Sequence, residues 1–429
     1  MGHFKIFAMQ DERIRELERE ARSGDPTARI LLARELARAG RREDARVALS
    51  SLLRSDPTSA EGVRALDDLG FGPLAADAPW PTTDGGNDRA RRSAHPGPRK
   101  GELVKRIRIG REGETALSLT VGPKTAYLAT RFDRLVALDL ENGSPRWIKE
   151  LDFHFDAPAI GEGERLLLGE GGKIQLLEPE RGDVVWSVRP PGRVETRDVP
   201  VAFAPRGLVV AAWEESLHAF EVWSGKLVWS FKANGELHTR PTVTPEAIFV
   251  STSRGYVHAV HFDGKLASEG RTPRTKNGRR VRIVGRELYL EDIWLSGDRV
   301  VKPLHVMGRD GAKLDATSRV APVQGGGFAC ALDDERALLY EDPARIVTCG
   351  ADTALTRERL RGGCADSTGC VYGYDPNRGF LWLDPTVTLV KKLLDNPSGP
   401  REGPWDHHVI GPDSTLLVPT EQGILLVIS

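Results

Sequence analysis

One stretch of the sequence carries an unusual density of positive charge. Between residues 271 and 286 it holds seven basic side chains and no acidic one: Arg271, Arg274, Lys276, Arg279, Arg280, Arg282 and Arg286. Such a cluster attracts polyanions, that is, nucleic acid, phospholipid or an acidic protein surface. No aromatic residue lies between the charges, which disfavours stacking on single-stranded nucleic acid. The segment falls between the fourth and fifth repeat units described below, so we predict a loop and an edge strand. A solvated loop paired with neighbouring acids is the favoured interpretation, and the alternative is a surface that binds a partner.

The residue types that most often ligate metals are not spaced for that role. The four cysteines lie beyond residue 329 without a CxxC pair: Cys330, Cys349, Cys364 and Cys370. We therefore expect buried, reduced thiols and no metal site. His258 and His261 fall on opposite faces of an expected strand, which argues against shared ligation. His407-His408 is interpreted as a connector, or alternatively as part of a central channel.

Signatures of catalysis are missing from the sequence. It contains no GxSxG, HExxH, P-loop or GxGxxG motif. The run Gly325–Gly327 lacks a following Lys-Ser/Thr and is interpreted as a turn, not a phosphate-binding loop. We therefore predict a protein that is not an enzyme and uses no cofactor.

Composition narrows the class further. The chain has 429 residues, a formal net charge of −1, 45 glycines and 28 prolines. The balanced charge disfavours a globally basic nucleic-acid binder, and the many turn formers favour a β architecture. No apolar run approaches the roughly 20 residues that span a bilayer. The first residues also lack the pattern of a signal peptide. We expect a cytoplasmic, bacterial-type protein without a membrane span.

Residues 1–70 are predicted to form a small all-α domain, because they lack strand-like alternation and are rich in helix formers. Asp25-Pro26 marks a helix start. The 34-residue unit 26–59 resembles a tetratricopeptide repeat, in which Ala33 and Ala45 are the small residues where two helices cross. A single repeat cannot bury its own apolar face. Flanking helices must therefore cap it, or it must dock on something else.

Residues 71–101 are rich in proline, glycine and arginine and are predicted to be a flexible linker. Over ~30 residues such a chain spans about 30 Å. We therefore expect a mobile helical domain that binds the same assembly as the rest of the protein, so that two weak contacts act together.

A repeat occupies residues 102–429. Three segments share an apolar strand, an acidic residue, a glycine turn and a tryptophan four residues after the glycine. Their glycine and tryptophan pairs are Gly143 and Trp147, Gly182 and Trp186, and Gly225 and Trp229. A period near 40 residues with turns inside each unit is typical of a propeller blade.

Weaker copies continue the repeat near residues 259, 306, 338, 381 and 425. Together they predict eight units of about 41 residues each, with seven as the alternative count. Residues 103–109 alternate like a strand. We expect them to pair beside 423–429, because closing a ring with both ends of the repeat region removes open sheet edges.

The segment Ala-Leu-Asp-x-x-x-Gly-x-x-x-Trp resembles the repeat of pyrroloquinoline-quinone-type β-propellers. The resemblance implies that the three tryptophans dock between neighbouring blades and that the three glycines form the turns. That family contains quinone-dependent dehydrogenases and also non-enzymatic members, such as the propeller subunit of the outer-membrane β-barrel assembly machinery. The dehydrogenases carry an adjacent cysteine pair, which this chain lacks. The resemblance is therefore to the non-enzymatic, assembly-factor-like branch.

These features predict a mainly β protein, an eight-bladed β-propeller preceded by a small helical-repeat domain. Its expected role is that of a non-catalytic scaffold or assembly adaptor for a protein partner of unknown identity. Two alternatives remain. One is an enzyme that binds a quinone or sugar ligand in the propeller channel. The other, less favoured, is a nucleic-acid-associated module that uses the basic segment.

Overall fold

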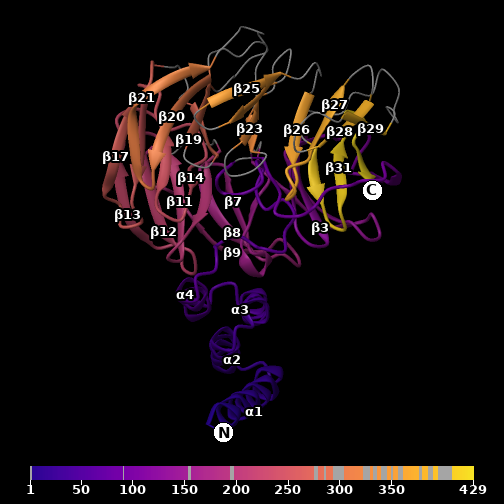
Figure 1. Cartoon of the computed structure of the whole chain (residues 1–429), viewed down its shortest axis with the longest axis vertical. Coiled ribbons are helices and arrows are strands. Elements are labelled where there is room, and N and C mark those ends of the chain that lie inside the picture. The colour runs from indigo at the N-terminus through magenta and orange to yellow at the C-terminus, as the bar shows by residue number, and fades with distance from the viewer. Residues whose placement is uncertain are drawn as a thin grey trace.

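The computed structural model describes the chain except for residues 1, 90, 153–155, 194–197, 275–278, 285–286, 293–303, 322–328, 332–335, 340–344, 349–350, 356–360, 376–378, 385–389 and 395–407. The described residues form four N-terminal helices and then eight four-stranded antiparallel sheets that follow one another around a ring (Figure 1). The chain is therefore mainly β, as predicted. No helix in this described part is long and apolar enough to cross a membrane.

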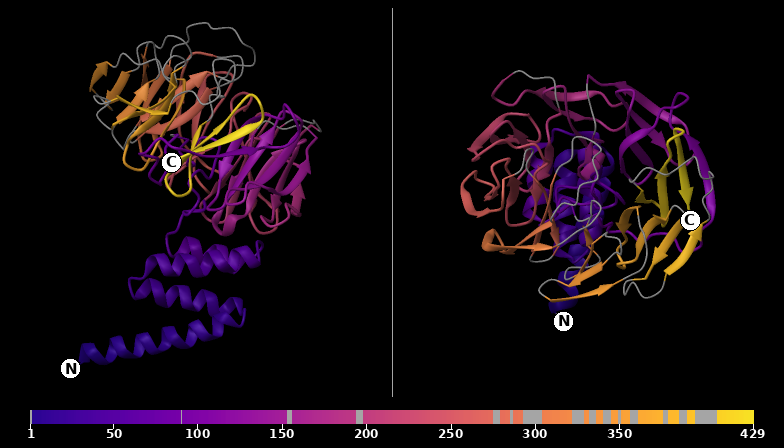
Figure 2. Two further views of the ribbon diagram at one scale, coloured as in Figure 1. Left: turned by 90° about the vertical axis from the view of Figure 1, so that its right-hand side faces the viewer. Right: turned by 90° about the horizontal axis from the view of Figure 1, so that it is seen from above.

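The helices stack one below another in a zigzag under the ring (Figure 2). They are α1 (Gly2–Arg22), α2 (Pro26–Arg38), α3 (Arg42–Ser55) and α4 (Ala60–Asp68). Asp25 caps α2, because its side chain accepts a hydrogen bond from the Thr27 backbone N–H at 2.9 Å. Ala33 of α2 and Ala45 of α3 are fully buried.

The sheets are numbered 1 to 8 along the chain. Sheet 1 contains β2 (Ala116–Val121), β3 (Thr125–Thr130), β4 (Arg134–Asp139) and β5 (Pro145–Glu150), and sheet 2 contains β6 (Ala159–Ile160), β7 (Leu166–Glu170), β8 (Lys173–Leu177) and β9 (Val184–Val188). Sheet 3 contains β10 (Val201–Ala204), β11 (Leu208–Trp213), β12 (Ser216–Glu221) and β13 (Leu227–Lys232), and sheet 4 contains β14 (Thr242–Val243), β15 (Ile248–Ser251), β16 (Tyr256–Val260) and β17 (Leu266–Arg271). A short 3-10 turn, η1 (Glu162–Glu164), joins β6 to β7.

Sheets 5 to 8 complete the ring. Sheet 5 contains β18 (Arg279–Val284), β19 (Glu287–Asp292), β20 (Leu304–Asp310) and β21 (Lys313–Ala321), and sheet 6 contains β22 (Ala329–Ala331), β23 (Arg336–Leu339), β24 (Arg345–Thr348) and β25 (Ala351–Leu355). Sheet 7 contains β26 (Arg361–Ala365), β27 (Val371–Asp375), β28 (Gly379–Leu383) and β29 (Val390–Leu394), and sheet 8 contains β30 (Val409–Gly411), β31 (Thr415–Pro419), β32 (Ile424–Ile428) and β1 (Leu103–Arg108). The weak copy expected near residue 338 falls on the second strand of sheet 6. The third strand, the counterpart of the other copies, begins at Arg345, so this register prediction was wrong.

The ring closes with strands from distant parts of the sequence. The outer strand of sheet 8 is β1, which pairs antiparallel with β32 so that Leu103 lies opposite Ile428. The predicted pairing of residues 103–109 beside 423–429 is therefore confirmed. The first strands of neighbouring sheets contact one another around the axis, whereas the fourth strands face outward (Figure 2).

The segment 71–101 is not the flexible linker that its composition predicts. It follows the helices and crosses the central opening of the ring on the side of the helices, where Trp80 is fully buried. We call residues 73–99 the central segment. Its backbone pairs with the ends of the first strands: Ala75 and Pro81 with Ile160, Trp80 with Val121, Asn87 with Val243, Asp88 with Ile283, and Arg91 and Ser93 with Ala365. Inner strands present unpaired N–H and C=O groups to the axis, and the central segment satisfies them.

Candidate interaction site where the helices, the central segment and the ring meet

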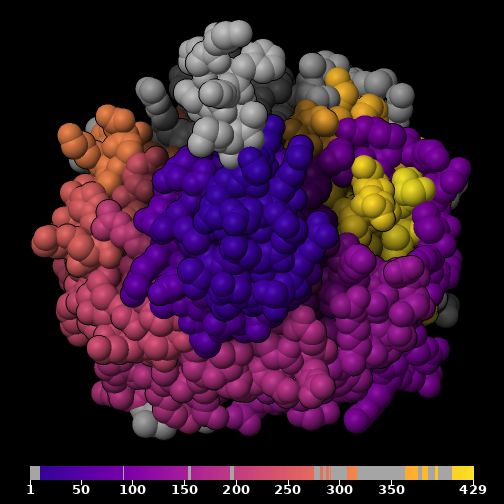
Figure 3. All heavy atoms as spheres, turned by 90° about the horizontal axis from the view of Figure 1, so that it is seen from below, coloured from indigo at the N-terminus to yellow at the C-terminus, as the bar shows by residue number. Residues whose placement is uncertain are grey.

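The helical unit is docked on the ring rather than tethered to it. Leu53 of α3 and Val63 and Leu66 of α4 belong to one hydrophobic core with Phe203 and Val222 of sheet 3. Seen from below, the helices cover the middle of this face of the ring (Figure 3). The expectation of a mobile helical head is therefore wrong. The apolar face that a single repeat cannot bury alone is buried here against sheets 2 and 3.

Two glycines allow the helices to approach the loops of the ring this closely. Gly163 has φ +76°, and a Cβ added there would fall 2.8 Å from Cβ of Leu53 and 2.9 Å from the backbone nitrogen of Arg54. Gly207 has φ +65°, and its added Cβ would fall 2.9 Å from Cγ1 of Val63. Both positions combine a left-handed backbone with direct contact to a helix, which only glycine accommodates without strain.

A buried carboxylate joins all three parts of the site. Glu162 of η1 is 1% exposed, and its Oε1 accepts a hydrogen bond from Nη1 of Arg46 in α3 at 2.8 Å. Ser50 of α3 donates to the same oxygen, and the Ala76 N–H of the central segment donates to Oε2 at 3.3 Å. Burial raises the pKa of Glu162 to about 7, because loss of hydration outweighs the opposing charge of Arg46. The helices therefore rest on a carboxyl group that titrates near neutrality.

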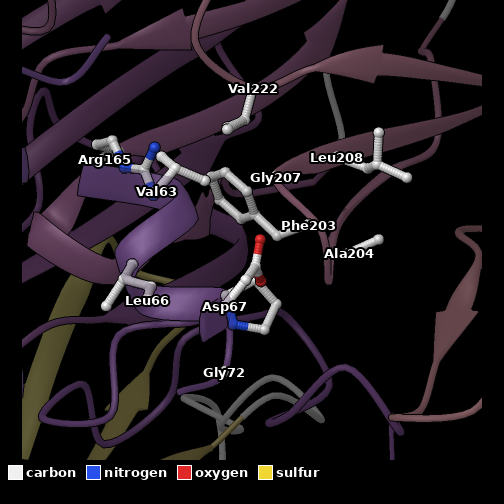
Figure 4. A pocket seen from close by; sticks show the side chains of 11 residues that line it. Val63, Leu66, Asp67, Gly72, Arg165, Phe203, Ala204, Gly207, Leu208 and Val222 are labelled. Atoms are coloured by element: carbon white, nitrogen blue, oxygen red, sulfur yellow. The ribbon is translucent and has the colours of Figure 1, made fainter. Parts of the chain in front are cut away.

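A buried arginine lies beside this carboxylate, at the edge of a small pocket between α4 and sheets 2 and 3 (Figure 4). Arg165 is 2% exposed, its Nε donates to the Glu162 carbonyl oxygen at 3.0 Å, and its guanidinium lies over the Phe203 ring. Burial lowers the pKa of Arg165 to about 10, so it stays cationic at neutral pH. Asp67 of α4 accepts from the Arg206 backbone N–H at 3.0 Å. Burial also raises the pKa of Asp67.

The central segment is anchored to the ring by a buried charge network. Asp84 accepts hydrogen bonds from Nε of Arg89 at 2.9 Å and from Nη1 of Arg282 at 3.0 Å. Nη1 of Arg282 also donates to the Arg89 carbonyl oxygen, and Nη1 of Arg89 donates to the Arg240 carbonyl oxygen. All of these side chains are buried. Such a network is tolerated in the interior because each charge has a partner and further hydrogen bonds.

A second anchor lies where the central segment leaves the axis. The carboxylate of Asp366, in the turn after β26, is fully buried and accepts hydrogen bonds from the Gly97 N–H at 3.0 Å and from Nη2 of Arg99 at 2.8 Å. Tyr372 and Thr368 donate to it as well. Burial alone would raise the pKa of Asp366, but these donors outweigh it and the pKa is lowered. This aspartate is therefore a fixed anion that holds the central segment.

The structure places the three repeat tryptophans at equivalent junctions, on the fourth strands of sheets 1, 2 and 3. Each is half-buried and donates Nε1 to a carbonyl of the next sheet: Trp147 to Pro179, Trp186 to Val222 and Trp229 to Phe262, at 2.9–3.0 Å. Each also packs on a turn glycine of that next sheet: Trp147 on Gly182, Trp186 on Gly225 and Trp229 on Gly264. Gly143, in the turn of sheet 1, meets Ile107 of sheet 8 instead.

The structure buries one residue of the basic segment, Arg282, so the prediction of an exposed surface is wrong for this residue. Arg279 and Arg280 begin β18, which is an edge strand of sheet 5, as predicted, on the side of the ring axis. Arg282 is 1% exposed and belongs to the buried network with Asp84. Arg271 ends β17 and lies over the ring of Tyr256, 4.3 Å from its centroid. Arg274 is exposed, whereas Lys276 and Arg286 lie outside the described residues.

The cysteines and histidines form no common site in the described part of the chain, which also contains no group of three His, Cys, Asp or Glu placed to hold a metal. Cys364 and Cys370 are buried thiols that take part in no disulfide. His258 is buried while His261 is exposed, as their alternation predicts. His408 is fully buried and contacts the Tyr372 carbonyl oxygen, and His407 lies outside the described residues.

Sequence reasoning missed the residues that build this site. Glu162, Arg165 and Asp84 belong to no motif, and their partners are remote in sequence. One signal was available. Trp80 is a large apolar residue inside a stretch whose composition is otherwise that of a linker, and such a residue is rarely left in water.

Comparison with known proteins defines the family. A family model described as "Outer membrane protein assembly factor BamB" matches residues 94–202 and 170–336, which together cover more than half of the chain. No curated protein matches the sequence.

Solved structures resemble the fold at low sequence identity. The quinohemoprotein alcohol dehydrogenase from Comamonas testosteroni aligns with a TM-score of 0.55 and 10% identity over 89% of this chain and 84% of its own. The computationally designed Ika8 protein aligns with a TM-score of 0.51 and 11% identity, over 75% and 98%. BamB from Moraxella catarrhalis aligns with a TM-score of 0.38 and 13% identity, over 67% and 98%. The first two similarities concern the fold alone.

Proposed function

We infer a function for this chain from its membership of the outer membrane protein assembly factor BamB family of β-propellers with pyrroloquinoline-quinone-type repeats. We propose that it is a non-catalytic scaffold or assembly adaptor that binds a protein partner. In this proposal each four-stranded sheet is one blade of an eight-bladed propeller, and α1–α4 form a tetratricopeptide-like unit.

The observation that carries the proposal is the docking of the helical unit onto one face of the ring. A common hydrophobic core, the Arg46–Glu162 contact and the central segment hold the helices in one place. The helices and the ring loops beside them therefore form one composite surface. Repeat surfaces of this kind supply contact area without a catalytic group. The two parts would bind a partner as one preorganised unit, and this replaces the two tethered sites that the sequence predicts.

The central segment disfavours the alternative of a ligand-binding enzyme. It crosses the ring axis on the helical side, where Trp80, Asp84 and Arg89 are buried against the inner strands. A quinone or sugar could not enter the channel from that mouth while these residues are in place. The residues present do not fit a quinone site at this mouth, and the sequence also lacks the adjacent cysteine pair of the dehydrogenases.

The nucleic-acid alternative loses its main support, because Arg282 is buried in an ion network and Arg271 lies over Tyr256. The charges described in the basic segment do not form one continuous exposed patch. A steep salt dependence of DNA or RNA binding by the full chain would revive this alternative.

Site-specific photo-crosslinking in native cells tests the proposal. Val47 is 55% exposed on α3, and Phe132 is 42% exposed in the β3–β4 turn on the opposite face. A photoreactive phenylalanine analogue at position 47 should capture one defined protein, whereas the same analogue at 132 should not. Capture of that protein only from 132, or of no protein from either site, would overturn the assignment of this face.

A further inference from the structure

The register of the outer strands shows where the tryptophan of the repeat is kept and where another residue replaces it. In sheet 1, Trp147 lies opposite Ala137 beside a one-residue bulge in the pairing of β4 with β5. Sheets 2 and 3 repeat this arrangement with Trp186 and Trp229. In each case the indole crosses to the next sheet and donates to the carbonyl that follows the third strand.

Sheet 8 has the same bulge with a lysine in the tryptophan position. The pairing of β1 with β32 places Lys105 opposite Val427, and the bulge separates Lys105 from Leu103. Nζ of Lys105 donates to the carbonyl oxygen of Leu140 at 2.9 Å and to that of Glu141. Leu140 directly follows the third strand of sheet 1, so its carbonyl is the counterpart of the acceptors used by the tryptophans. The lysine therefore keeps the hydrogen bond of the indole without its ring.

A pocket lies at this junction. Its volume is about 600 Å³, within the range of sites that hold small organic groups. Apolar side chains line it from both sheets: Val104, Pro123, Leu140, Pro412, Leu417 and Val427. At the junction between sheets 4 and 5, Ser268 takes the same position. Its hydroxyl donates to the Ala312 carbonyl at 3.1 Å and accepts from the Leu314 N–H at 2.7 Å, so a small side chain there bonds directly to the next sheet.

The charges around the pocket are balanced. Lys105 and Lys124 lie on its rim together with Glu141 and Asp413. A strongly anionic or cationic occupant would therefore meet repulsion as well as attraction. An apolar lining with a mixed polar rim suits a flat apolar group that carries one polar edge, as an indole or phenol does.

We propose that the pocket between sheets 8 and 1 receives a tryptophan or tyrosine side chain presented by the protein partner. The inference rests on the proposed scaffold function and names the chemistry of one contact. Its support is internal to the molecule, since three other junctions hold an indole in the same register position. Aromatic side chains that fill such pockets commonly dominate the energy of protein interfaces.

A substitution that fills the pocket with a side chain of the protein itself tests the proposal. Lys105→Trp should restore the missing indole and raise the melting temperature by a few degrees. N-acetyl-tryptophanamide is the probe, and its binding is measured by saturation-transfer NMR. We expect the full-length native chain to bind it with weak affinity, and Lys105→Trp to weaken that binding at least tenfold. Arg106→Trp is the matched control, because Arg106 is the exposed neighbour on the same strand and should leave binding unchanged.

A second variant guards against misfolding. Val104 is 52% exposed on the rim, so Val104→Asp should fold normally while weakening probe binding about fivefold. Probe binding that survives both Lys105→Trp and Val104→Asp, or N-acetyl-leucinamide binding equally well, would overturn the proposal. So would a dimer of the native chain that dissociates in Lys105→Trp, because the occupant would then be a second copy. None of these results depends on the partner, so the scaffold function is tested separately by crosslinking.

Discussion

Arg282 on the innermost strand of sheet 5 and Asp84 in the central segment form a buried ion pair with an Nη1–Oδ1 distance of 3.0 Å. This contact joins two parts of the sequence whose compositions suggest exposed, solvated chain. It turns a basic cluster and a proline-rich stretch into parts of one interior.

Removing one partner of this pair should destabilise the ring strongly. Arg282→Met leaves Asp84 buried with a weakened set of partners, and breaking such a pair costs about 3–5 kcal/mol. The measurement is the free energy of unfolding from denaturant titration. Arg271→Met is the control, because this exposed arginine lies over the Tyr256 ring and donates to its hydroxyl, and its loss should cost about 0.5–1 kcal/mol. Equal losses for the two variants would contradict the buried network.

Trp80→Ala should also be strongly destabilising, although the residue lies in a stretch with the composition of a linker. Trp80 is fully buried, and its backbone pairs with Val121. Truncating a buried tryptophan costs about 3–5 kcal/mol. Lys100→Ala, an exposed position in the same stretch, should change stability by less than about 0.5 kcal/mol. If thermal unfolding is the same for both variants, the central segment does not pack as described.

Two substitutions of a junction tryptophan should separate the contribution of its hydrogen bond to stability from that of its ring packing. Trp186→Phe keeps an aromatic ring but loses the bond from Nε1 to the Val222 carbonyl, which is worth about 1 kcal/mol. Trp186→Ala should cost about 3 kcal/mol, the low end for an aromatic truncation, because the side chain is half-buried. Urea unfolding separates the two steps. A phenylalanine variant as unstable as the alanine variant would show that ring packing contributes little.

Glu162→Gln should change how stability depends on pH. The pKa of Glu162 is raised in the folded state to about 7, so the folded protein binds this proton more tightly than the unfolded chain. The stability that the group contributes is full below about pH 4.3 and is lost as pH rises through about 7. Relative to the native chain, Glu162→Gln should therefore become more stable by roughly 2–3 kcal/mol between pH 4.5 and 8.

Differential unfolding curves across this pH range measure the effect of Glu162. Glu43→Gln is the matched control, because Glu43 contacts the same Arg46 while its side chain is 73% exposed. Its difference curve should be small and should not rise with pH. A flat curve for Glu162→Gln would mean that Arg46 holds Glu162 ionised throughout.

Sequence periodicity predicted the local elements well. The turn glycines and tryptophans of sheets 1 to 3 reveal the repeat because each sheet must contact the next in the same way. The closing strand at 103–108 could be predicted from the same repeat, because the incomplete last unit needs a partner strand. The register failed near residue 338, where no tryptophan follows a glycine by four residues to mark the third and fourth strands.

The candidate site was less accessible because its contacts are long-range. Composition describes residues 71–101 as solvated chain, but the unpaired edges of the inner strands give that chain backbone partners. The basic segment shows the same limitation. Its charges suggest a surface, whereas Arg282 lies on the innermost strand of sheet 5 and bonds to Asp84 in the interior.

The pairing of β1 with β32 sets the order in which the protein can mature during synthesis. The Ser429 N–H donates to the Glu102 carbonyl, 327 residues earlier in the sequence. A ribosome therefore releases the helices, the central segment and β1 long before their partner strands exist. Contacts so distant in sequence make folding slow and leave apolar surface exposed meanwhile. The nascent chain should consequently depend on chaperones until its final strand emerges.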